Sequence, residues 1–245
     1  LKIGDRVVND VEPKDRDIAM VFQNYALYPH MTVYDNMAFG LKLRKVPKDQ
    51  IDKMVREAAK ILDLEPLLDR KPKALSGGQR QRIGIARALS VDPEFIICDE
   101  PISALDVSIQ AQVINMLKEL QEERGLTYLF IAHDLSVVKY ISDRVVVMYL
   151  GTMVETAETD ELYAHPMHPY TQALLSAIPE ADPNKAKANQ RIPIKGEIPS
   201  PINPKNCCRF AERCQHATER CFKEMPQMKE IAPGHKVACH LVEDK

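Results

Sequence analysis

The sequence predicts an α/β fold built on a mostly parallel β-sheet, with a helical insertion and a proline- and cysteine-rich C-terminal appendage. Short apolar runs alternate with amphipathic stretches between Met20 and Tyr149, which is typical of parallel strands joined by helices that cover both faces of a sheet. Residues 31–74 contain helical and loop patterns but no strand pattern. After His165 prolines become frequent and regular periodicity fades, which indicates the appendage.

The individual elements follow from the residue patterns in chain order. Residues 1–24 are typical of strands that end at Met20-Val21-Phe22-Gln23. Asp49–Leu64 is predicted to be a helix because its apolar residues repeat every three or four positions. Gly125 is a natural stop for another helix. Further helices are expected at Ser76–Leu89, Ile109–Arg124 and Ser136–Ile141, and strands at Glu94–Cys98, Thr127–Ala132 and Arg144–Tyr149.

These patterns predict a first domain at residues 1–164, with a helical subdomain at about 31–85, and an extension at residues 165–245. The formal net charge of −2 over 245 residues gives no electrostatic reason to expect nucleic acid as a partner. The apolar runs are far shorter than the roughly 18–20 residues needed to span a bilayer.

Two motifs carry the functional prediction. The run Leu75–Arg82 contains the adjacent pair Gly77-Gly78 at the start of a predicted helix, where backbone N–H groups and the helix dipole favour phosphate. About twenty residues later an apolar strand ends in Asp99-Glu100. A carboxylate pair in this position suits a Mg²⁺ ligand followed by a residue that orients the hydrolytic water. Pro101 suits the break in the strand that would separate the two side chains.

In this order, the motifs resemble the ATPase subunits of ABC transporters. The resemblance implies a RecA-like sheet, with ATP and Mg²⁺ as cofactors. It implies that Asp99 holds Mg²⁺, that Gln23 touches both Mg²⁺ and the attacking water, and that Glu100 activates this water. His133, after the strand Thr127–Ala132, would contact the γ-phosphate and Glu100.

The resemblance also implies that two such subunits share their nucleotides. Ser76, Gly77, Gly78 and Gln79 would bind the γ-phosphate of ATP held by a second ABC ATPase subunit, identical or homologous. Asp106 would contact that subunit.

The phosphate loop Gly-x-x-x-x-Gly-Lys-Ser/Thr that such an ATPase needs does not occur in the sequence. We therefore expect an N-terminally incomplete nucleotide-binding domain that is inactive alone. An inactive fragment is the alternative. A soluble ABC ATPase acting on DNA or ribosomes is disfavoured by the absence of a second signature and of coiled-coil heptads.

The resemblance falls into two pieces. Up to about Arg82, notably in Val21–Val33 and Leu68–Pro72, the chain is similar to maltose and multiple-sugar importer ATPases. From about Ile83 onward it is similar to oligopeptide and dipeptide importer ATPases. Peptide import is favoured and sugar import is the alternative. Either implies two transmembrane permease subunits, which would meet Met31–Gly40, and an external solute-binding protein acting indirectly. The subunit would lie at the cytoplasmic face of the cell membrane, held there by the permeases.

The cysteines give one further prediction. Cys98 sits in an apolar strand and is expected to be a buried small side chain. Four others fall where peptide-importer ATPases carry a cysteine motif: Cys208, Cys214, Cys221 and Cys239. Four thiolates suit a [4Fe–4S] cluster or Zn²⁺, and the cluster is favoured. Reduced free thiols are the alternative.

Overall fold

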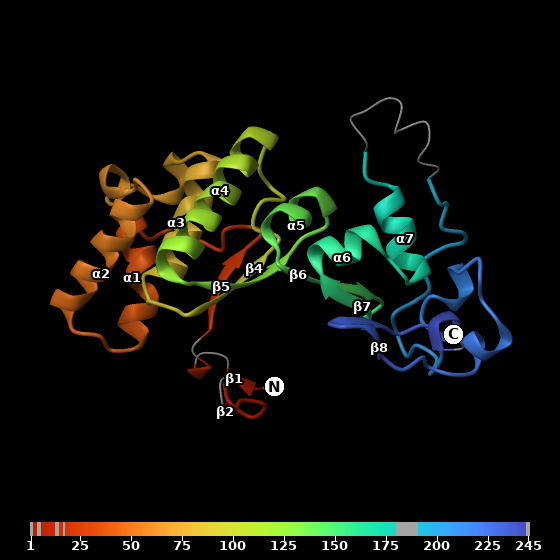
Figure 1. Cartoon of the computed structure of the whole chain (residues 1–245). Helices are drawn as coiled ribbons and strands as arrows, with labels where there is room; N and C mark the ends of the chain where they lie inside the picture. The colour runs from red at the N-terminus through yellow and green to blue at the C-terminus, as the bar shows by residue number, and fades with distance from the viewer. Residues whose placement is uncertain (1, 4–5, 13–14, 17, 180–190, 244–245) are drawn as a thin grey trace. The chain divides into compact units, whose positions relative to one another are not determined.

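The computed structural model describes residues 2–3, 6–12, 15–16, 18–179 and 191–243 (Figure 1). The chain forms two compact units, Leu1–His133 and Asp134–Lys245. The first unit begins with a short antiparallel pair, β1 (Lys2–Ile3) and β2 (Arg6–Val7).

The core of the first unit is a three-stranded parallel sheet in the order β3-β4-β5. Its strands are β3 (Ala19–Phe22), β4 (Phe95–Asp99) and β5 (Thr127–Ile131). The predicted strands differ from β4 and β5 by a single residue at their ends. The expected parallel sheet is therefore present in this unit.

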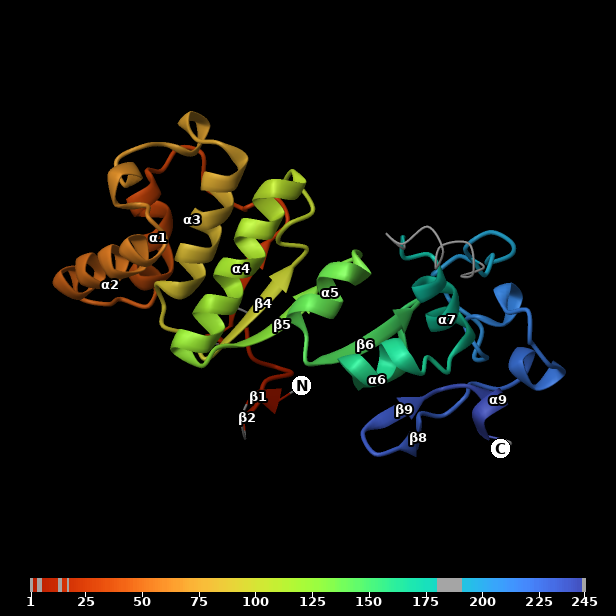
Figure 2. The ribbon, with the colours of Figure 1, turned by 45° about the horizontal axis from the view of Figure 1, so that its top comes forward.

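In the described part of the first unit, helices cover only one face of this sheet. The prediction that helices cover both faces is therefore wrong for the described residues. Figure 2 shows α3 (Gly77–Leu89) and α4 (Val107–Arg124) on one side of the sheet. Ile96 and Cys98 of β4 are fully buried, so we assign their side chains to this covered side. The alternating residues of the sheet point the other way, and Phe95 and Leu129 are 39% and 49% exposed. The described part of the chain thus leaves an apolar sheet face accessible.

The predicted helical insertion consists of α1 (Val33–Leu43), α2 (Lys48–Ile61) and two short 3₁₀ turns, Glu65–Leu67 and Pro72–Ala74. Thr32 caps α1 by accepting a hydrogen bond from the backbone N–H of Asp35 at 3.1 Å. Figure 2 shows α1 and α2 beside α3, and these helices bury Met37 and Ile83 between them and their neighbours.

The second unit is built on an antiparallel sheet in the order β6-β7-β9-β8. The predicted strand Arg144–Tyr149 is present as β6, but it pairs antiparallel with β7 rather than extending a parallel sheet. The remaining elements are β7 (Thr152–Glu158), β8 (Lys229–Ala232), β9 (His235–Val237), α5 (Leu135–Ile141), α6 (Thr159–Ala164), α7 (Pro169–Ser176), α9 (His240–Glu243) and the 3₁₀ turns Ala211–Arg213 and Glu219–Phe222.

The compact units divide between His133 and Asp134, not at the predicted boundary between residues 164 and 165. Glu155 of β7 pairs with Val237 of β9, which joins the two sides of the predicted boundary in one sheet. A buried pair reinforces this connection, because Nε2 of His235 lies 2.8 Å from Oε1 of Glu155 and both side chains are almost fully buried.

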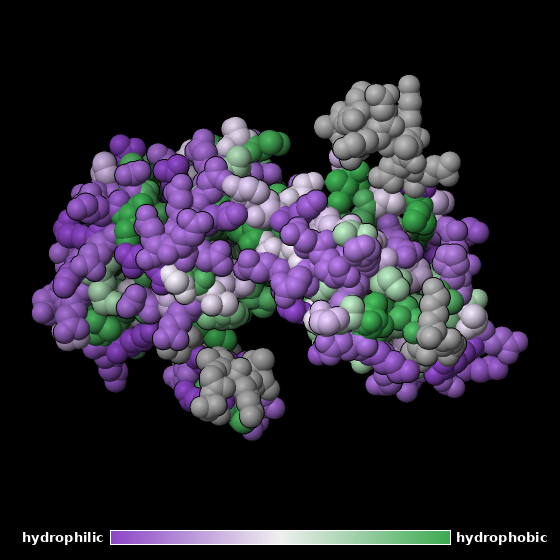
Figure 3. Space-filling model, in the orientation of Figure 1, coloured by the Kyte–Doolittle hydropathy of each residue, from purple (hydrophilic) through white to green (hydrophobic). Residues whose placement is uncertain are grey.

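None of the helices in the described part of the chain has the length and hydropathy needed to cross a bilayer. In the face shown by Figure 3, the surface is mostly hydrophilic with separate hydrophobic patches.

Candidate functional site

The carboxyl ends of the three parallel strands of the first unit lie level with one another. Phe22 of β3 pairs with Asp99 of β4, and Asp99 pairs with Ile131 of β5. Gln23 and Glu100 directly follow the first two of these residues, and His133 comes two residues after the third. The strand ends therefore bring side chains from three distant parts of the chain to one edge, where α/β folds commonly bind ligands.

Glu100 is held at the centre of this edge. Its backbone adopts a left-handed conformation, with φ of 45°, and its N–H donates to the carbonyl of Ile131 at 3.0 Å. Oε2 of Glu100 accepts a hydrogen bond from Nε2 of Gln23 at 3.0 Å. Oε1 of Glu100 lies 3.6 Å from Nδ1 of His133. The turn thus sets the carboxylate between an amide and an imidazole, while leaving it about a third exposed to solvent.

Asp99 is the last residue of β4 and is half-buried. It alternates with Cys98, which faces the helices and whose pKa is raised by burial to about 12. This thiol stays protonated and packs as a small apolar group, as expected from the sequence. Asp99 therefore stands on the face of β4 that the described helices do not cover, next to the turn that carries Glu100.

The run Leu75–Arg82, called the signature motif from here on, forms the N-terminus of α3. The N–H of Gln79 donates to Oγ of Ser76 at 3.2 Å, and Oε1 of Gln79 accepts from the N–H of Ser76 at 3.0 Å. This reciprocal capping box uses Gln79 to fix the helix start. Because Oγ of Ser76 acts as an acceptor in it, the hydroxyl proton remains able to donate to a phosphate oxygen.

The two signature glycines have steric roles in the packing. A Cβ on Gly78 would come within 2.9 Å of Cγ2 of Ile109 in α4, so a side chain there would push the helices apart. A Cβ on Gly77 would come within 3.2 Å of the Tyr25 hydroxyl. Ser76, Gly77 and Gly78 thus lie at the end of α3 rather than in the group formed by Gln23, Glu100 and His133.

Asp106 begins α4. Its Oδ1 accepts hydrogen bonds from the N–H of Ile109 and from Oγ of Ser108, both at 3.1 Å. The structure therefore gives Asp106 a capping role, and its expected contact with a second subunit stays a prediction.

Two family models match the chain. A model described as "ABC transporter" matches residues 2–103, and one described as "Oligopeptide/dipeptide transporter, C-terminal region" matches residues 154–221. The oligopeptide transport ATP-binding protein AppF of Bacillus subtilis is 51% identical over 230 residues, which are 92% of this chain and 70% of AppF. OppF of Escherichia coli, with the same description, is 50% identical over 228 residues, which are 91% of this chain and 68% of OppF.

This chain belongs to the family of ABC-type oligopeptide transport ATP-binding proteins. A solved structure agrees with the fold of this peptide-transport ATPase. CbiO1 from Clostridium perfringens, part of the ABC transporter complex cbiONQ, is 34% identical with a TM-score of 0.56, over 61% of this chain and 60% of that one. The peptide-transport relatives match both sides of the signature, including the N-terminal part that resembles sugar importers.

The four predicted cysteine ligands of this peptide-transport ATPase lie in the second unit and influence one another. Burial raises the pKa of the Cys239 thiol to about 11, and the thiolate charges of the other three add to this effect. Burial also raises the pKa of Cys208 and of Cys214, and the charge of Cys221 raises both further.

Backbone N–H groups bond to two of the same sulfurs. The N–H of His216 donates to Sγ of Cys214 at 3.4 Å, and the N–H of Thr218 donates to Sγ of Cys221 at 3.5 Å. Cys207 differs, since its Sγ instead donates to the carbonyl of Cys208. No group of three or more His, Cys, Asp or Glu side chains within the described ranges is arranged to hold a metal ion.

One residue that holds the segment after Gln23 was not singled out from the sequence. Asn36 is fully buried in α1, where it accepts from the N–H of Tyr28 at 2.8 Å and donates to the carbonyl of Tyr28 at 3.1 Å. It fixes the loop after Gln23, in which the Tyr28 ring packs on Phe39 with centroids 4.6 Å apart. A polar residue inside an otherwise apolar helical stripe is the signal that could have identified it.

Proposed function

We propose that this chain is part of an ATPase subunit that energises the uptake of oligopeptides or dipeptides by an ABC importer. The observation that carries the proposal is the carboxylate of Glu100, which Gln23 and His133 flank at the level ends of three parallel strands. The names of the relatives supply the substrate class, since AppF and OppF are oligopeptide transport proteins.

The residues present fit Mg²⁺ and ATP by the chemistry of their donor atoms. Asp99 and Gln23 would hold Mg²⁺, which prefers oxygen ligands. Ser76, Gly77 and Gly78, with Gln79 as their cap, would face the γ-phosphate of a nucleotide held by a second ATPase subunit. Bound Mg²⁺ would neutralise charge on the phosphates.

The chemistry assigned to this chain is proton transfer and positioning. Glu100 accepts the proton of the attacking water, and its hydrogen bond from Gln23 keeps the carboxylate in one orientation. His133, 73% exposed on its side chain, extends from the same edge and would donate to the γ-phosphate. Asp106 would contact the second subunit across the shared nucleotides.

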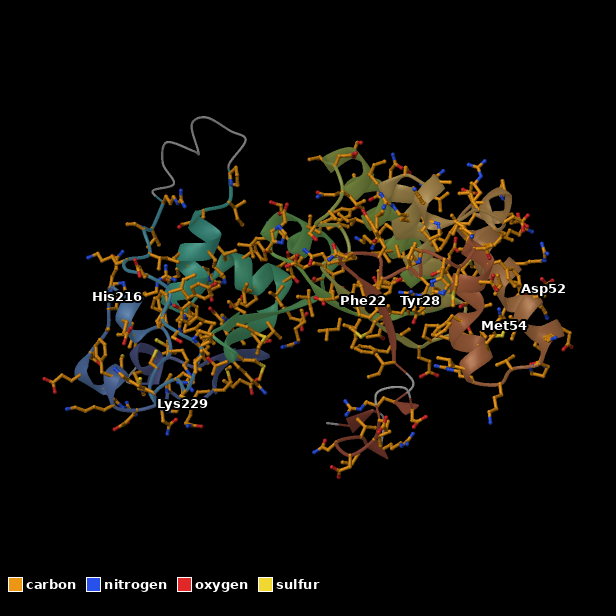
Figure 4. All side chains as sticks on the ribbon, turned by 180° about the vertical axis from the view of Figure 1, so that it is seen from behind. Phe22, Tyr28, Asp52, Met54, His216 and Lys229 are labelled. Carbon is orange, nitrogen blue, oxygen red and sulfur yellow. The ribbon has the colours of Figure 1, made fainter. Side chains whose placement is uncertain are left out.

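The permease subunits would dock on the helical insertion, which would place the ATPase at the cytoplasmic face of the membrane. The groove that we propose for this contact lies outside Met31–Gly40, the segment predicted from the sequence. It has a volume of about 400 Å³ and lies between α2 and the ends of α3 and α4. Its lining includes the apolar side chains of Met54 and Ile61 and charged side chains of both signs, Lys53, Arg124, Glu57 and Asp92. Figure 4 labels Met54 on α2. A lining that combines apolar side chains with charges of both signs suits one amphipathic helix of a permease.

Replacing Met54 by lysine in the full-length subunit should abolish co-purification with a peptide permease pair, because a charge would replace an apolar side chain in the lining of the groove. The measurement is capture of the subunit by tagged peptide permeases and, in parallel, by tagged sugar permeases. The matched control is Arg56→Ala on the same helix, which removes only an exposed ion pair with Asp52. Capture by sugar permeases alone would overturn the peptide assignment, and normal capture of the Met54→Lys variant would overturn the docking site.

We also propose a metal centre at Cys208, Cys214, Cys221 and Cys239, with a [4Fe–4S] cluster ahead of Zn²⁺. The carbonyl of Cys221 accepts from the N–H of Cys208 at 3.0 Å, and backbone N–H groups donate to the sulfurs of Cys214 and Cys221. These contacts support the proposal, since hydrogen bonds to sulfur are typical of thiolate ligands. The sulfurs would have to draw closer on binding, and binding would release their protons.

Anaerobic purification should give protein that contains iron and sulfide and absorbs near 400 nm. Cys208→Ser should lose the metal, whereas Cys207→Ser should keep it, because Cys207 stands outside the coupled set. If the protein contained zinc and no sulfide, the centre would be a Zn²⁺ site instead of an iron–sulfur cluster. Metal-free wild-type protein from anaerobic cells would rule the centre out.

A further inference from the structure

The segment that follows Gln23 makes an unusually tight turn. Tyr25 and Ala26 both adopt left-handed backbone conformations, with φ of 60° and 45°. The N–H of Tyr25 donates to the carbonyl of Phe22 at 3.1 Å, and the N–H of Ala26 donates to the carbonyl of Asn24 at 2.6 Å. Residues other than glycine rarely adopt this backbone conformation. Contacts with the surrounding structure must therefore hold the turn in place.

One face of α3 holds this turn. Gly77, Arg80, Gly84 and Arg87 are spaced by three, four and three residues and so line one side of the helix. Arg80 places its guanidinium 5.3 Å from the centroid of the Tyr25 ring. Gly77 lies beside the Tyr25 hydroxyl, and a Cβ on Gly84 would lie 3.6 Å from the Tyr25 carbonyl oxygen.

Arg87 completes the attachment at the other end of this face. Its guanidinium donates to the carbonyl of Ala26 at 2.5 Å and to that of Tyr25 at 3.3 Å. Both strained residues are therefore tied to the helix by their main chain, while the Tyr25 ring contacts the first turns of the same helix. The turn cannot move independently of the helix that carries the signature serine and glycines.

We propose that Tyr25 is a positioning residue that couples the signature end of α3 to the Gln23–Glu100 pair of the same subunit. Gln23 is two residues before Tyr25 and donates to Glu100 at 3.0 Å. A shift of α3 on contact with the partner's nucleotide changes where Gln23 holds the Glu100 carboxylate. The two composite sites of a dimer are thereby linked through each subunit. This inference rests on the proposed ATPase function.

The coupling predicts a loss of turnover without a loss of nucleotide binding. In the full-length subunit assembled with its permeases, Tyr25→Leu should lower kcat for ATP about tenfold, within the range usual for coupling between sites. The KM for ATP and the unfolding midpoint should stay unchanged. Tyr25→Phe, which keeps the ring over Arg80, should recover most of the turnover. Arg56→Ala, on α2, is the control.

A double-mutant cycle with Gln23→Ala tests whether Tyr25 acts through Gln23. In that background Tyr25→Leu should cause no further loss of kcat. The proposal would be overturned if Tyr25→Leu left kcat unchanged, or if Tyr25→Phe lowered kcat as much as Tyr25→Leu. It would also be overturned if the losses of kcat from Tyr25→Leu and Gln23→Ala were additive in the double variant. If Tyr25→Leu does not fold, Arg87→Lys takes its place with the same expected losses. The assembled wild type is assayed beside these variants, so an absence of ATP turnover in wild type would refute the ATPase function itself rather than the coupling.

Discussion

Replacing Glu100 by glutamine in the full-length subunit should lower ATP turnover about a hundred- to ten-thousandfold, the usual contribution of a positioned general base. Glutamine keeps the shape of the side chain and can still accept a hydrogen bond from Gln23. It cannot take a proton from water. The affinity for ATP should therefore stay within a few-fold of wild type, and only kcat should fall.

The matched control is Glu94→Gln, an exposed glutamate directly before the same strand, at the end opposite Glu100. It changes the charge equally but lies one strand length from Glu100, so kcat should not change. Steady-state ATPase assays in the assembled transporter measure both variants. If Glu100→Gln retained turnover within threefold of wild type, another group would have to be the base.

The sequence alone could place Gln23, Glu100 and His133 at one edge, since parallel strands end together where their apolar runs stop. It could not show that Gln23 and Glu100, separated by 77 positions, are hydrogen-bonded. That contact depends on the left-handed turn at Glu100. No local pattern predicts this conformation for a glutamate, because tertiary contacts hold it.

The antiparallel sheet of the second unit could not be predicted from the sequence patterns, for a different reason. β8 and β9 have four and three residues and carry charged side chains, so they lack a recognisable apolar alternation. The turn at Gly234, with φ of 75°, is their only local signal. Their place in the sheet depends on pairing with β7 and on the Glu155–His235 contact, which joins residues 80 positions apart.

The His168 side chain should make the second unit sensitive to mild acid. It is 1% exposed, and burial lowers its pKa from 6.5 to about 4, with the nearby Glu155 opposing part of the shift. Its Nδ1 accepts from the N–H of Tyr170 at 3.0 Å and so caps α7 in the neutral form. The backbone N–H of His168 donates to Oε2 of Glu155 at 3.0 Å.

The direction of the pH effect follows from the lowered pKa. Above pH 6.5 both the folded and the unfolded chain hold this imidazole neutral, so its contribution to stability is complete. As the pH falls from 6.5 towards 4, the unfolded chain binds a proton that the folded chain does not, and the free energy of unfolding decreases. The loss is about 2 kcal/mol at pH 5 and about 3 kcal/mol below pH 4.

His168→Asn separates this titration from other effects, because asparagine also caps helices but does not titrate. Hydrogen exchange of β7 and α7 amides, corrected for intrinsic rates, reports the local free energy of opening at each pH. Wild-type protein should lose about 2 kcal/mol more than His168→Asn between pH 7 and pH 5. Parallel curves for the two proteins would mean that His168 is protonated in the folded state and that the acid sensitivity comes from other groups. Only a difference between the curves is informative, since Glu161 titrates in the same unit with its pKa lowered by hydrogen bonds to His165 and His235.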